Sequence, residues 1–597
     1  MKKYLLLLCA AMALLMIPFV PLSYAAIGDY DYSNPKDGDV DGKDLAAMIG
    51  SPSPDVAGFA GYFGQTYTLS TRPPNILLII ADDTGVDVHS NLYPGLIDTL
   101  TAMYGSGVIG RPASVPNLTD RLATQGVVFS NAWAQPYCSP SRATVATGLF
   151  EDKTQVKGPN DPMKTYHTTF VKKLQDAGYS TAMIGKWHLA GSSPYTSGTL
   201  PKQAGFDYYR GHNDAYIPSY WSYPVHWQDS TTPANSFNTI AAASVQARTL
   251  PGIASTKYAP VVKGADTIDW INARKNEDPT KPWFVWLAFN LSHVTTQNPN
   301  MHVPNKDTLD LATRCELGDP DQQCSPPTNC LGASGKYGVD PPQVGSCTGK
   351  QLMRAMTNAM DTVIGKILDV VDSVGSDTYV IFIGDNGTPW YGSGYGNQID
   401  NMYITTAGRG KGSSFESGCR VPLAIRGPNI AAGGQKSAPV HLADLFATIL
   451  TLAGLTPPTQ NYDNTGALVN SDSKSLTPIL FGSADDTGRD PDTGYLLTET
   501  NVTTFGTMWQ GARNARYKVL CPGQGVNPTF PSSLSNCGFY DLITDPLEEH
   551  PRTAADQKPT SCASYKDGTW QPPDPRWHFC RLADVLINYG ILSGTLP

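Results

Sequence analysis

Two apolar runs far apart in the chain have the same sequence pattern. Residues 75–80 and 378–383 are mostly apolar and partly β-branched, and acidic or amide residues follow each run almost at once. Unbroken runs of this length are typical of strands buried on both faces of a parallel sheet. Ligands of open α/β sheets bind at the carboxyl ends of such strands. We therefore expect a site built from the residues after the two strands: Asp82, Asp83, Asp385 and Asn386.

Carboxylate and amide oxygens at this position suit a hard cation, Ca²⁺ first, with Mg²⁺ as the alternative. A single acid after the first strand could instead cap a helix. Asp385-Asn386-Gly387 alone more often forms a tight turn. The occurrence of the same pattern at two strand ends favours the cation.

Length and composition limit the class of protein. The chain has 597 residues, 41% of them hydrophobic, with 56 Gly and 48 Pro. This allows one large domain and a smaller one, and it predicts a loop-rich α/β enzyme. The net charge of -9 argues against binding nucleic acid by broad electrostatic attraction. We therefore expect no nucleic-acid partner.

The N-terminus predicts export. Residues 1–25 combine two lysines, an apolar stretch and a small-residue cleavage site, as in a secretory signal peptide. An uncleaved anchor is the alternative, but the apolar stretch is short for a bilayer. We expect a periplasmic or secreted protein without stable membrane insertion after cleavage. Within residues 26–72, the stretch Asp37–Asp44 resembles half of a dockerin-like calcium loop. It lacks the first carboxylates, so an acidic linker is the alternative.

The chain contains 11 cysteines, and export would permit disulfides. Four of them lie in one loop-rich stretch: Cys315, Cys324, Cys330 and Cys347. A metal cluster is the alternative there, but the stretch has no Cys-x-x-Cys spacing and no histidine among the cysteines. Two local pairs are expected further on, Cys521 with Cys537 and Cys562 with Cys580. Cys419 is then left over as a small buried residue.

Four further segments carry reactive side chains: 137–148, 178–191, 281–293 and 408–422. In the second, a strand over 180–184 would deliver Lys186 and His188 to one site, because residues two apart on an extended chain face the same way. In the first, a helix could begin near Ser141, capped by a serine. The candidate residues of these segments are Cys138, Arg142, Lys186, His188, His293 and Lys411.

The stretch from Tyr137 to Gly148, with its Cys-x-Pro-x-Arg core and Thr-Gly end, resembles the signature of the type I sulfatases. The other three segments resemble further motifs of that family. The two strand ends with Asp82-Asp83 and Asp385-Asn386 resemble both the sulfatases and the wider alkaline-phosphatase superfamily. The resemblance implies that a formylglycine-generating enzyme oxidises Cys138 to formylglycine, the catalytic aldehyde. It also implies a metal site formed by Asp82, Asp83, Cys138, Asp385 and Asn386.

The same resemblance implies a role for each remaining residue. Lys186 and Lys411 would hold the sulfate oxygens, and Arg142 would hold the hydrated aldehyde. His293, with help from Lys411, would protonate the leaving alcohol, and His188 would take the proton that allows sulfate to leave. Glu416 and Arg420 are expected to form a structural pair. The C-terminal pattern of residues 539–548 also resembles the family, but we assign it no chemistry.

The predicted fold is α/β, with a large, mostly parallel, mixed sheet flanked by helices, as in alkaline phosphatase. Residues 73–470 would form the catalytic domain, interrupted by a cysteine-rich insertion at about 294–350 that could cover the substrate. The periodicity of 352–371 predicts a core helix. Residues 471–597 would form a small α+β domain on an antiparallel sheet.

The predicted function is hydrolysis of aryl or carbohydrate sulfate monoesters to an alcohol and inorganic sulfate. One alternative in the same superfamily is a phosphodiesterase or phosphonate monoester hydrolase that uses the same aldehyde. A second, of another class, is a non-catalytic binder of sulfated glycans. The aromatic stretch Tyr216–Trp227 is compatible with stacking on sugars or with a place in the core.

Overall fold

The computed structural model describes residues 72–319, 329–332, 334–373, 375, 377–389, 402–403, 409–482, 485, 495–498, 508–523, 534–588 and 595–596. The predicted signal peptide and the acidic loop lie outside the described residues. Contacts divide the chain into two units, and the elements below belong to the unit made of Pro74–Leu480 and Ala484–Pro597. Within the described part, no helix is both long and apolar enough to span a bilayer.

A ten-stranded sheet forms the centre of this unit. The block from β11 to β5 is parallel, whereas β12 and β6 run antiparallel to its two sides. The predicted mixed, mostly parallel sheet is therefore confirmed. Its strands, in spatial order, are β13 (Gly434–Lys436), β2 (Val127–Phe129), β12 (Leu423–Arg426), β11 (Thr378–Gly384), β1 (Asn75–Ala81), β10 (Trp283–Ala288), β4 (Ser180–Lys186), β5 (Tyr208–His212), β6 (Val225–Gln228) and β7 (Asn238–Ile240).

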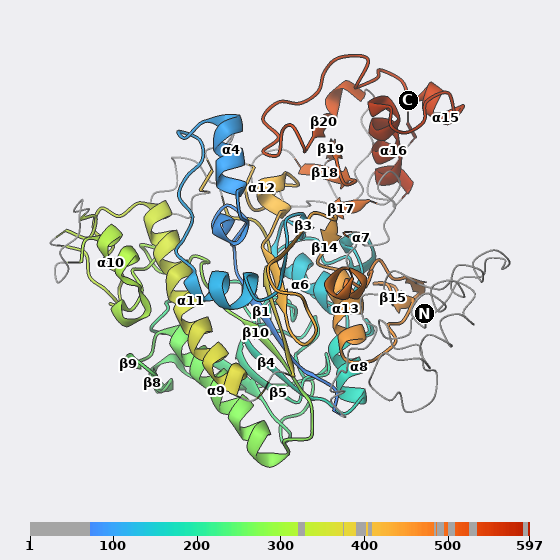
Figure 1. Cartoon of the computed structure of the whole chain (residues 1–597). Coiled ribbons are helices and arrows are strands. Elements are labelled where there is room, and N and C mark those ends of the chain that lie inside the picture. Colours follow the sequence, from blue (N-terminus) through green and yellow to red (C-terminus); the bar gives the residue numbers. More distant parts are fainter. Residues whose placement is uncertain are drawn as a thin grey trace, which may run out of the picture. The chain divides into compact units, whose positions relative to one another are not determined.

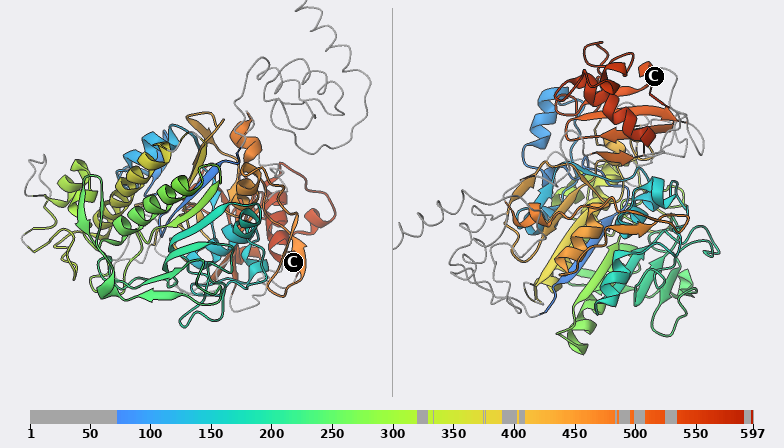
Figure 2. Two further views of the ribbon diagram at one scale, coloured as in Figure 1. Left: turned by 90° about the horizontal axis from the view of Figure 1, so that it is seen from below. Right: turned by 90° about the vertical axis from the view of Figure 1, so that its right-hand side faces the viewer.

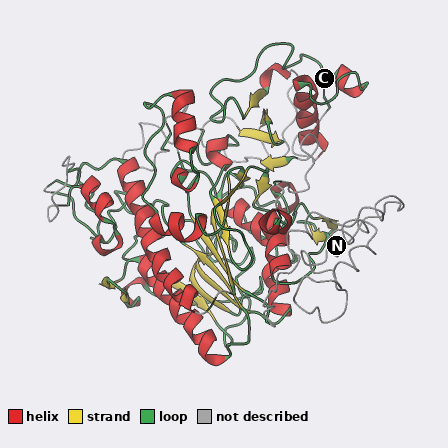
Figure 3. Cartoon of the chain, in the orientation of Figure 1, coloured by secondary structure: helices red, strands yellow, loops and turns green. Residues whose placement is uncertain are grey.

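Helices cover both faces of the sheet (Figures 1 and 3). One layer contains α9 (Ala259–Glu277) and α11 (Gly349–Ser373), which pack on each other. The other contains α6 (Cys138–Thr147), α8 (Phe170–Asp176) and α13 (Asp444–Leu452). Figure 2 shows the sheet between the two layers. This arrangement buries β1, β10 and β11 along their whole length, as their unbroken apolar sequences predict.

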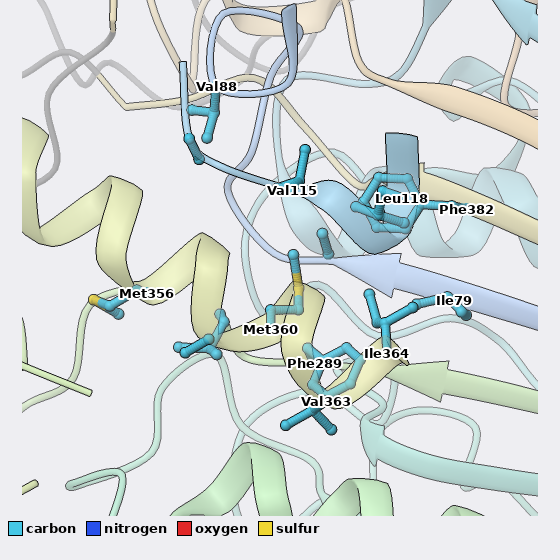
Figure 4. Close-up of a cluster of buried hydrophobic side chains, with 14 of the residues drawn as sticks. Ile79, Val88, Val115, Leu118, Phe289, Met356, Met360, Val363, Ile364 and Phe382 are labelled. Atoms are coloured by element: carbon cyan, nitrogen blue, oxygen red, sulfur yellow. The ribbon is translucent and has the colours of Figure 1, made fainter. Parts of the chain in front are cut away.

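The predicted core helix at 352–371 is confirmed as part of α11. Its buried face includes Met356, Met360 and Ile364, which belong to the same buried cluster as Ile79 of β1 and Phe382 of β11 (Figure 4). The methionines of this helix are therefore packing residues. Burying such a side chain contributes roughly 1.5–3 kcal/mol, so this face is one of the main supports of the strands that carry the site.

A second, four-stranded antiparallel sheet occupies the C-terminal region, as predicted. Its strands are β17 (Leu496–Thr498), β18 (Met508–Arg513), β19 (Tyr517–Gly523) and β20 (Gly538–Asp541), and α16 (Pro575–Asn588) packs on them. The predicted disulfides Cys521–Cys537 and Cys562–Cys580 are both present. Cys419 is buried and free, also as predicted.

The insertion packs against the segment that follows β5. It contains α10 (Leu311–Leu317) and a disulfide between Cys330 and Cys347, and Cys315 is disulfide-bonded as well. The Ser219 hydroxyl donates to Asp340 at 3.0 Å, and Trp221 stacks on His302 with ring centroids 5.3 Å apart. The insertion is thus anchored beside residues 216–221.

Shorter elements complete the fold: α4 (Leu96–Tyr104), α5 (Pro116–Leu118), β3 (Ala132–Trp133), α7 (Glu151–Thr154), β8 (Arg248–Leu250), β9 (Ile253–Thr256), α12 (Glu416–Cys419), β14 (Val440–His441), β15 (Gln460–Tyr462), β16 (Leu468–Asn470) and α15 (Ala563–Lys566).

Candidate active site

Two neighbouring strand ends bring three carboxylates together. In the pairing of β1 with β11, Ala81 lies opposite Gly384, so the residues that follow both strands share one edge. The Asp83 amide donates to the Asp385 carboxylate at 3.1 Å. Asp83 adopts a left-handed backbone with φ 60°, a conformation that a non-glycine residue keeps only when its surroundings impose it.

Cys138 lies at the first turn of α6, opposite these carboxylates. Its Sγ is 3.5 Å from Asp82 Oδ1 and 3.9 Å from Asp83 Oδ1, and only 1% of the residue is exposed. Burial raises the pKa of the Cys138 thiol, although the Lys186 and Lys411 ammoniums oppose that rise. The unmodified side chain is therefore a thiol and not a thiolate.

The helix starts earlier than the sequence predicted. It begins at Cys138, and no side chain caps it. Ser139 and Ser141 do not act as caps, because their hydroxyls donate to the carbonyls of His188 and Gln135. The free N–H groups of the first helical turn, at the positive end of the helix dipole, therefore lie at residue 138 itself.

The Arg142 guanidinium holds two parts of the site in place through hydrogen bonds. It donates to Asp385 Oδ2 from Nη2 at 2.7 Å and to the Lys186 carbonyl from Nη1 at 2.6 Å, and it is fully buried. Burial and the neighbouring Asp82 raise the pKa of Asp385, and Arg142 opposes this rise. In this structure Arg142 holds a carboxylate and the end of β4.

Two lysines neutralise the other carboxylates. Lys186 Nζ lies 2.7 Å from Asp82 Oδ2, and Lys411 Nζ lies 2.5 Å from Asp83 Oδ1 and 3.3 Å from Cys138 Sγ. Burial opposes ionisation of Asp82, but Lys186 holds the pKa of Asp82 below its usual value. Burial acts in the same way on Asp83, and His293 and Lys411 together hold its pKa low. Both groups are carboxylates at neutral pH.

The same residues fit a divalent cation. Potential ligand atoms of Asp82, Asp83, Cys138 and His293 lie within 4.8 Å of one another. Asn386 donates from Nδ2 to Asp83 Oδ1 at 2.9 Å, while its Oδ1 is buried without a hydrogen-bond partner among the described residues. A buried amide oxygen beside carboxylates is a ligand of the type that Ca²⁺ and Mg²⁺ prefer. The sequence-based ligand set did not include His293.

His188 is held by a residue that the sequence did not indicate. Its Nε2 lies 2.9 Å from Asn160 Oδ1, and its Nδ1 is buried with no partner in the described part of the chain. An acceptor at Nε2 places the ring proton there and leaves Nδ1 as the basic nitrogen. Burial and Lys186 hold the pKa of His188 well below its usual value, so the ring is neutral.

His188 and its partner Asn160 both adopt left-handed backbones, with φ 61° and φ 70°. The expected extended geometry from Lys186 to His188 is therefore wrong, because β4 ends at Lys186. The histidine nevertheless lies close enough to Lys186, Arg142 and Lys411 for their charges to lower its pKa.

His293 lies on the other side of Lys411. Its Nε2 is 3.2 Å from Lys411 Nζ and 3.4 Å from Asp83 Oδ2, and its Nδ1 is 2.8 Å from the Val294 carbonyl. The edge-to-face ring of Tyr216 covers it, with centroids 4.7 Å apart, and Tyr216 is 46% exposed. Tyr220 and Tyr223, from the same aromatic stretch, are buried in the core. Tyr216 alone of these three tyrosines therefore lies between the site and solvent.

Comparison with known proteins identifies the chain. The sulfatase family model matches residues 74–455, which include every candidate residue above. This chain belongs to the sulfatase family.

Relatives of this sulfatase act on sulfate esters, as their names state. It is 25% identical over 560 residues to N-acetylgalactosamine-6-sulfatase of Homo sapiens, covering 86% of this chain and 89% of that protein. It is 25% identical over 452 residues to an arylsulfatase of Klebsiella aerogenes, covering 66% and 89%. Among solved structures, Ps i-CgsB matches with a TM-score of 0.55 at 20% identity, covering 88% of this chain and 100% of that one. A Pseudoalteromonas sulfatase, PsFucS1, matches with a TM-score of 0.53 at 18% identity, covering 88% and 92%. The structural likeness shows the shared alkaline-phosphatase-like fold.

The sulfatase site also contains a row of buried, hydrogen-bonded polar side chains behind Lys186. The Lys263 ammonium donates to Asn290 Oδ1, and Asn290 Nδ2 lies 2.5 Å from His212 Nε2. Burial lowers the pKa of Lys263 to about 7. No sequence motif marked Lys263, because it lies in the second turn of α9 and looks like an ordinary helical lysine.

The expected pair of Glu416 with Arg420 is not what the sulfatase structure shows. Glu416 forms ion pairs with Arg513 at 2.9 Å and Lys518 at 3.3 Å. Arg420 donates from Nε to the Ser130 carbonyl at 2.7 Å. The partners of Glu416 come from the C-terminal sheet, at sequence separations that local reasoning could not bridge.

Proposed function

We propose that this sulfatase hydrolyses sulfate monoesters of phenols or sugars to an alcohol and inorganic sulfate, using residue 138 as formylglycine together with a bound divalent cation. This proposal rests mainly on the position of Cys138 Sγ, which lies within 4 Å of two carboxylates and of Lys411. A buried thiol with a raised pKa is a poor nucleophile in itself. Oxidation would convert it into a group suited to this position.

Formylglycine at residue 138 and a divalent cation would supply part of the chemistry. Residue 138, once oxidised and hydrated, supplies the oxygen nucleophile for sulfur and a second oxygen for the later release of sulfate. A divalent cation, held by Asp82, Asp83, Asp385 and Asn386 beside residue 138, supplies positive charge for the sulfate oxygens.

The side chains of the site have separate tasks. Lys186 and Lys411 bind sulfate oxygens and stabilise the charge that develops on them. Arg142 keeps Asp385 ionised and fixes the end of β4. Burial lowers the pKa of His293, so its ring is neutral, with Nδ1–H directed to the Val294 carbonyl and Nε2 facing the Lys411 ammonium. His293 would take a proton at Nε2 from Lys411 and pass it to the leaving alcohol. His188 accepts a proton at Nδ1 when sulfate is released.

A sulfated carbohydrate is the substrate class that we infer. Tyr216 presents an exposed aromatic ring next to His293, on the side where the leaving alcohol must lie. Aromatic rings of this kind suit the apolar face of a sugar. Several relatives are named N-acetylgalactosamine-6-sulfatase, and one solved structure of this fold is a complex with a neocarrahexaose.

Maturation and location complete the proposal. The partner during maturation would be a formylglycine-generating enzyme, and the cation would be Ca²⁺, with Mg²⁺ as the alternative. The protein would be exported to the periplasm or secreted after loss of residues 1–25. Residues 73–470 would form the catalytic domain and residues 471–597 a smaller C-terminal domain.

Mass spectrometry of the peptide that contains residue 138, combined with turnover of an aryl sulfate, tests the proposal. The expected result is a formylglycine mass and turnover that Cys138→Ala abolishes. Full turnover by Cys138→Ser would contradict it. A phosphodiester tested in parallel should be a much poorer substrate, and the reverse preference would favour the phosphodiesterase alternative.

A further inference from the structure

The C-terminal motif Asp545-Pro546-Leu547-Glu548 has a defined place in the structure. It forms the turn after β20, where the Asp545 carboxylate accepts hydrogen bonds from the amides of Glu549 and His550 at 3.0 and 2.8 Å. The turn directs Glu548 into the protein, where it is fully buried. Glu548 has a left-handed backbone with φ 58°, so the surrounding contacts impose its position.

Glu548 belongs to a buried cluster of four charges. Its Oε2 accepts from the Glu416 amide at 2.5 Å, and its Oε1 lies 2.8 Å from Lys518 Nζ. Lys518 and Arg513 also pair with Glu416. Two carboxylates and two cations balance when all are ionised. Removing one member of such a buried set leaves an uncompensated charge, which is strongly unfavourable.

This cluster reaches the segment that carries Lys411. Glu416 lies five residues after Lys411 and begins α12. Between them, the Gly412 amide donates to the Pro136 carbonyl at 2.9 Å, which ties this segment to the one that precedes Cys138. The backbone amide of Glu416 is itself the donor to Glu548, so the contact holds the main chain and not only a side chain.

The same cluster reaches the approach to Cys138. Trp133, five residues before Cys138, donates from its indole N–H to Glu416 Oε1 at 2.9 Å. Lys518 Nζ lies 4.6 Å above the Trp133 ring. The Ala134 amide donates to the Cys419 carbonyl at 2.8 Å. One cluster therefore contacts both segments whose ends meet at the 3.3 Å contact of Lys411 with Cys138.

We propose that Glu548 and Lys518 of the C-terminal region are positioning residues for the reaction, and that they act by fixing the Lys411 segment against the Cys138 segment. The role in catalysis rests on the function proposed above. A misplacement of about 1 Å at a reacting group can cost on the order of a hundredfold in rate. A tether at Glu416 is close enough in sequence to control the position of Lys411.

Two variants test the tether, with a matched control. Glu548→Gln removes the charge that Lys518 and the Glu416 amide share. Glu548→Asp keeps the charge but is too short to reach both, and it guards against a misfolded Gln variant. The control is Asp541→Asn on β20, which also loses a buried carboxylate of the C-terminal region, in this case one paired with Arg516 and Arg552.

We expect kcat for an aryl sulfate to fall at least tenfold in both Glu548 variants and less than twofold in Asp541→Asn, at a temperature where circular dichroism shows all three folded. Hydrogen exchange measured by mass spectrometry gives a readout that needs no activity. Peptides covering 410–419 and 132–138 should exchange at least tenfold faster in the Glu548 variants. In Asp541→Asn the change should stay within 516–552.

Equal kcat losses in all three variants would assign the effect to general loosening of the C-terminal region and overturn the proposal. So would unchanged exchange at 410–419 in the Glu548 variants. A wild-type protein without activity on any sulfate ester would contradict the proposed function, but the exchange measurement would still decide whether the tether exists.

Discussion

Asn160→Gly should slow one half of the reaction and leave the other half intact. Asn160 contacts His188 through a single hydrogen bond, from the histidine Nε2 to the amide oxygen at 2.9 Å. Glycine removes that acceptor and also suits the left-handed backbone of residue 160, with φ 70°. The substitution therefore deletes the hydrogen bond without adding backbone strain, which alanine would do. The backbone amide that donates to Ser139 Oγ at 3.2 Å is kept.

The size of the effect follows from that hydrogen bond. A hydrogen bond between neutral groups contributes about 0.5–1.5 kcal/mol, and a buried N–H left without a partner costs about 1–3 kcal/mol. Without the acceptor, the His188 proton can move to Nδ1, the nitrogen that must stay basic. A loss of about 1–2 kcal/mol at the step that uses Nδ1 corresponds to a fall of roughly 5- to 30-fold in its rate.

Stopped-flow kinetics with a chromogenic aryl sulfate separates the two halves. In the proposed mechanism His188 acts after the alcohol has left, so Asn160→Gly should release about one equivalent of phenol in a fast burst and then turn over slowly. Asn160→Asp, which keeps an acceptor, should recover most of the turnover. Unchanged kcat in Asn160→Gly would refute the reasoning, and so would a lower kcat without a burst.

Three further predictions concern other parts of the protein. Tyr216→Ala should raise KM for a sulfated oligosaccharide about tenfold, which corresponds to a loss of roughly 1.4 kcal/mol of binding energy. Its kcat for a small aryl sulfate should stay within twofold of the wild-type value. Equal losses on both substrates would contradict a role in sugar binding. Titration calorimetry should show that Asn386→Ala weakens Ca²⁺ binding at least tenfold. Chelation of Ca²⁺ from the wild-type protein should lower its free energy of unfolding by about 2.7 kcal/mol, relative to the same protein with Ca²⁺ at a hundred times Kd. Burial lowers the pKa of His89 from its usual value to about 3, so the folded protein binds fewer protons than the unfolded chain and stability should fall as the pH drops from 6.5 to 3. His89→Leu should make that fall shallower by on the order of 4 kcal/mol at the acid end, measured by urea unfolding against pH.

Strand pattern predicted the part of the site that depends on the sheet. The apolar runs of β1 and β11 are long, buried and bounded by acids, so their pairing and the meeting of Asp82, Asp83 and Asp385 followed from the rules for parallel sheets. The partners of the remaining groups come from loops. Asn160 reaches His188 from a turn, and nothing in its local sequence indicates which side chain it will contact.

Long-range pairing explains the other differences. Glu416 and Arg420 are four residues apart, and the pairing expected from that spacing is overridden by Arg513 and Lys518, which the C-terminal sheet brings in. Likewise, Arg142 pairs with the buried Asp385, because an unpaired carboxylate at that depth would be costly. Such choices depend on which charges are buried together, and a single sequence does not show this.

The burial of Cys138 also sets the order of events in the life of the chain. A modifying enzyme cannot reach a side chain that is 1% exposed, so the oxidation proposed above would have to precede closure of the site. One of the groups that close it, Lys411, lies 273 residues further along the chain. At about 5–20 residues per second, a ribosome needs on the order of 15–50 s to make that stretch. For that interval the nascent Cys138 segment is complete while Lys411 does not yet exist, so the proposed modification would have at least that long before the site can close.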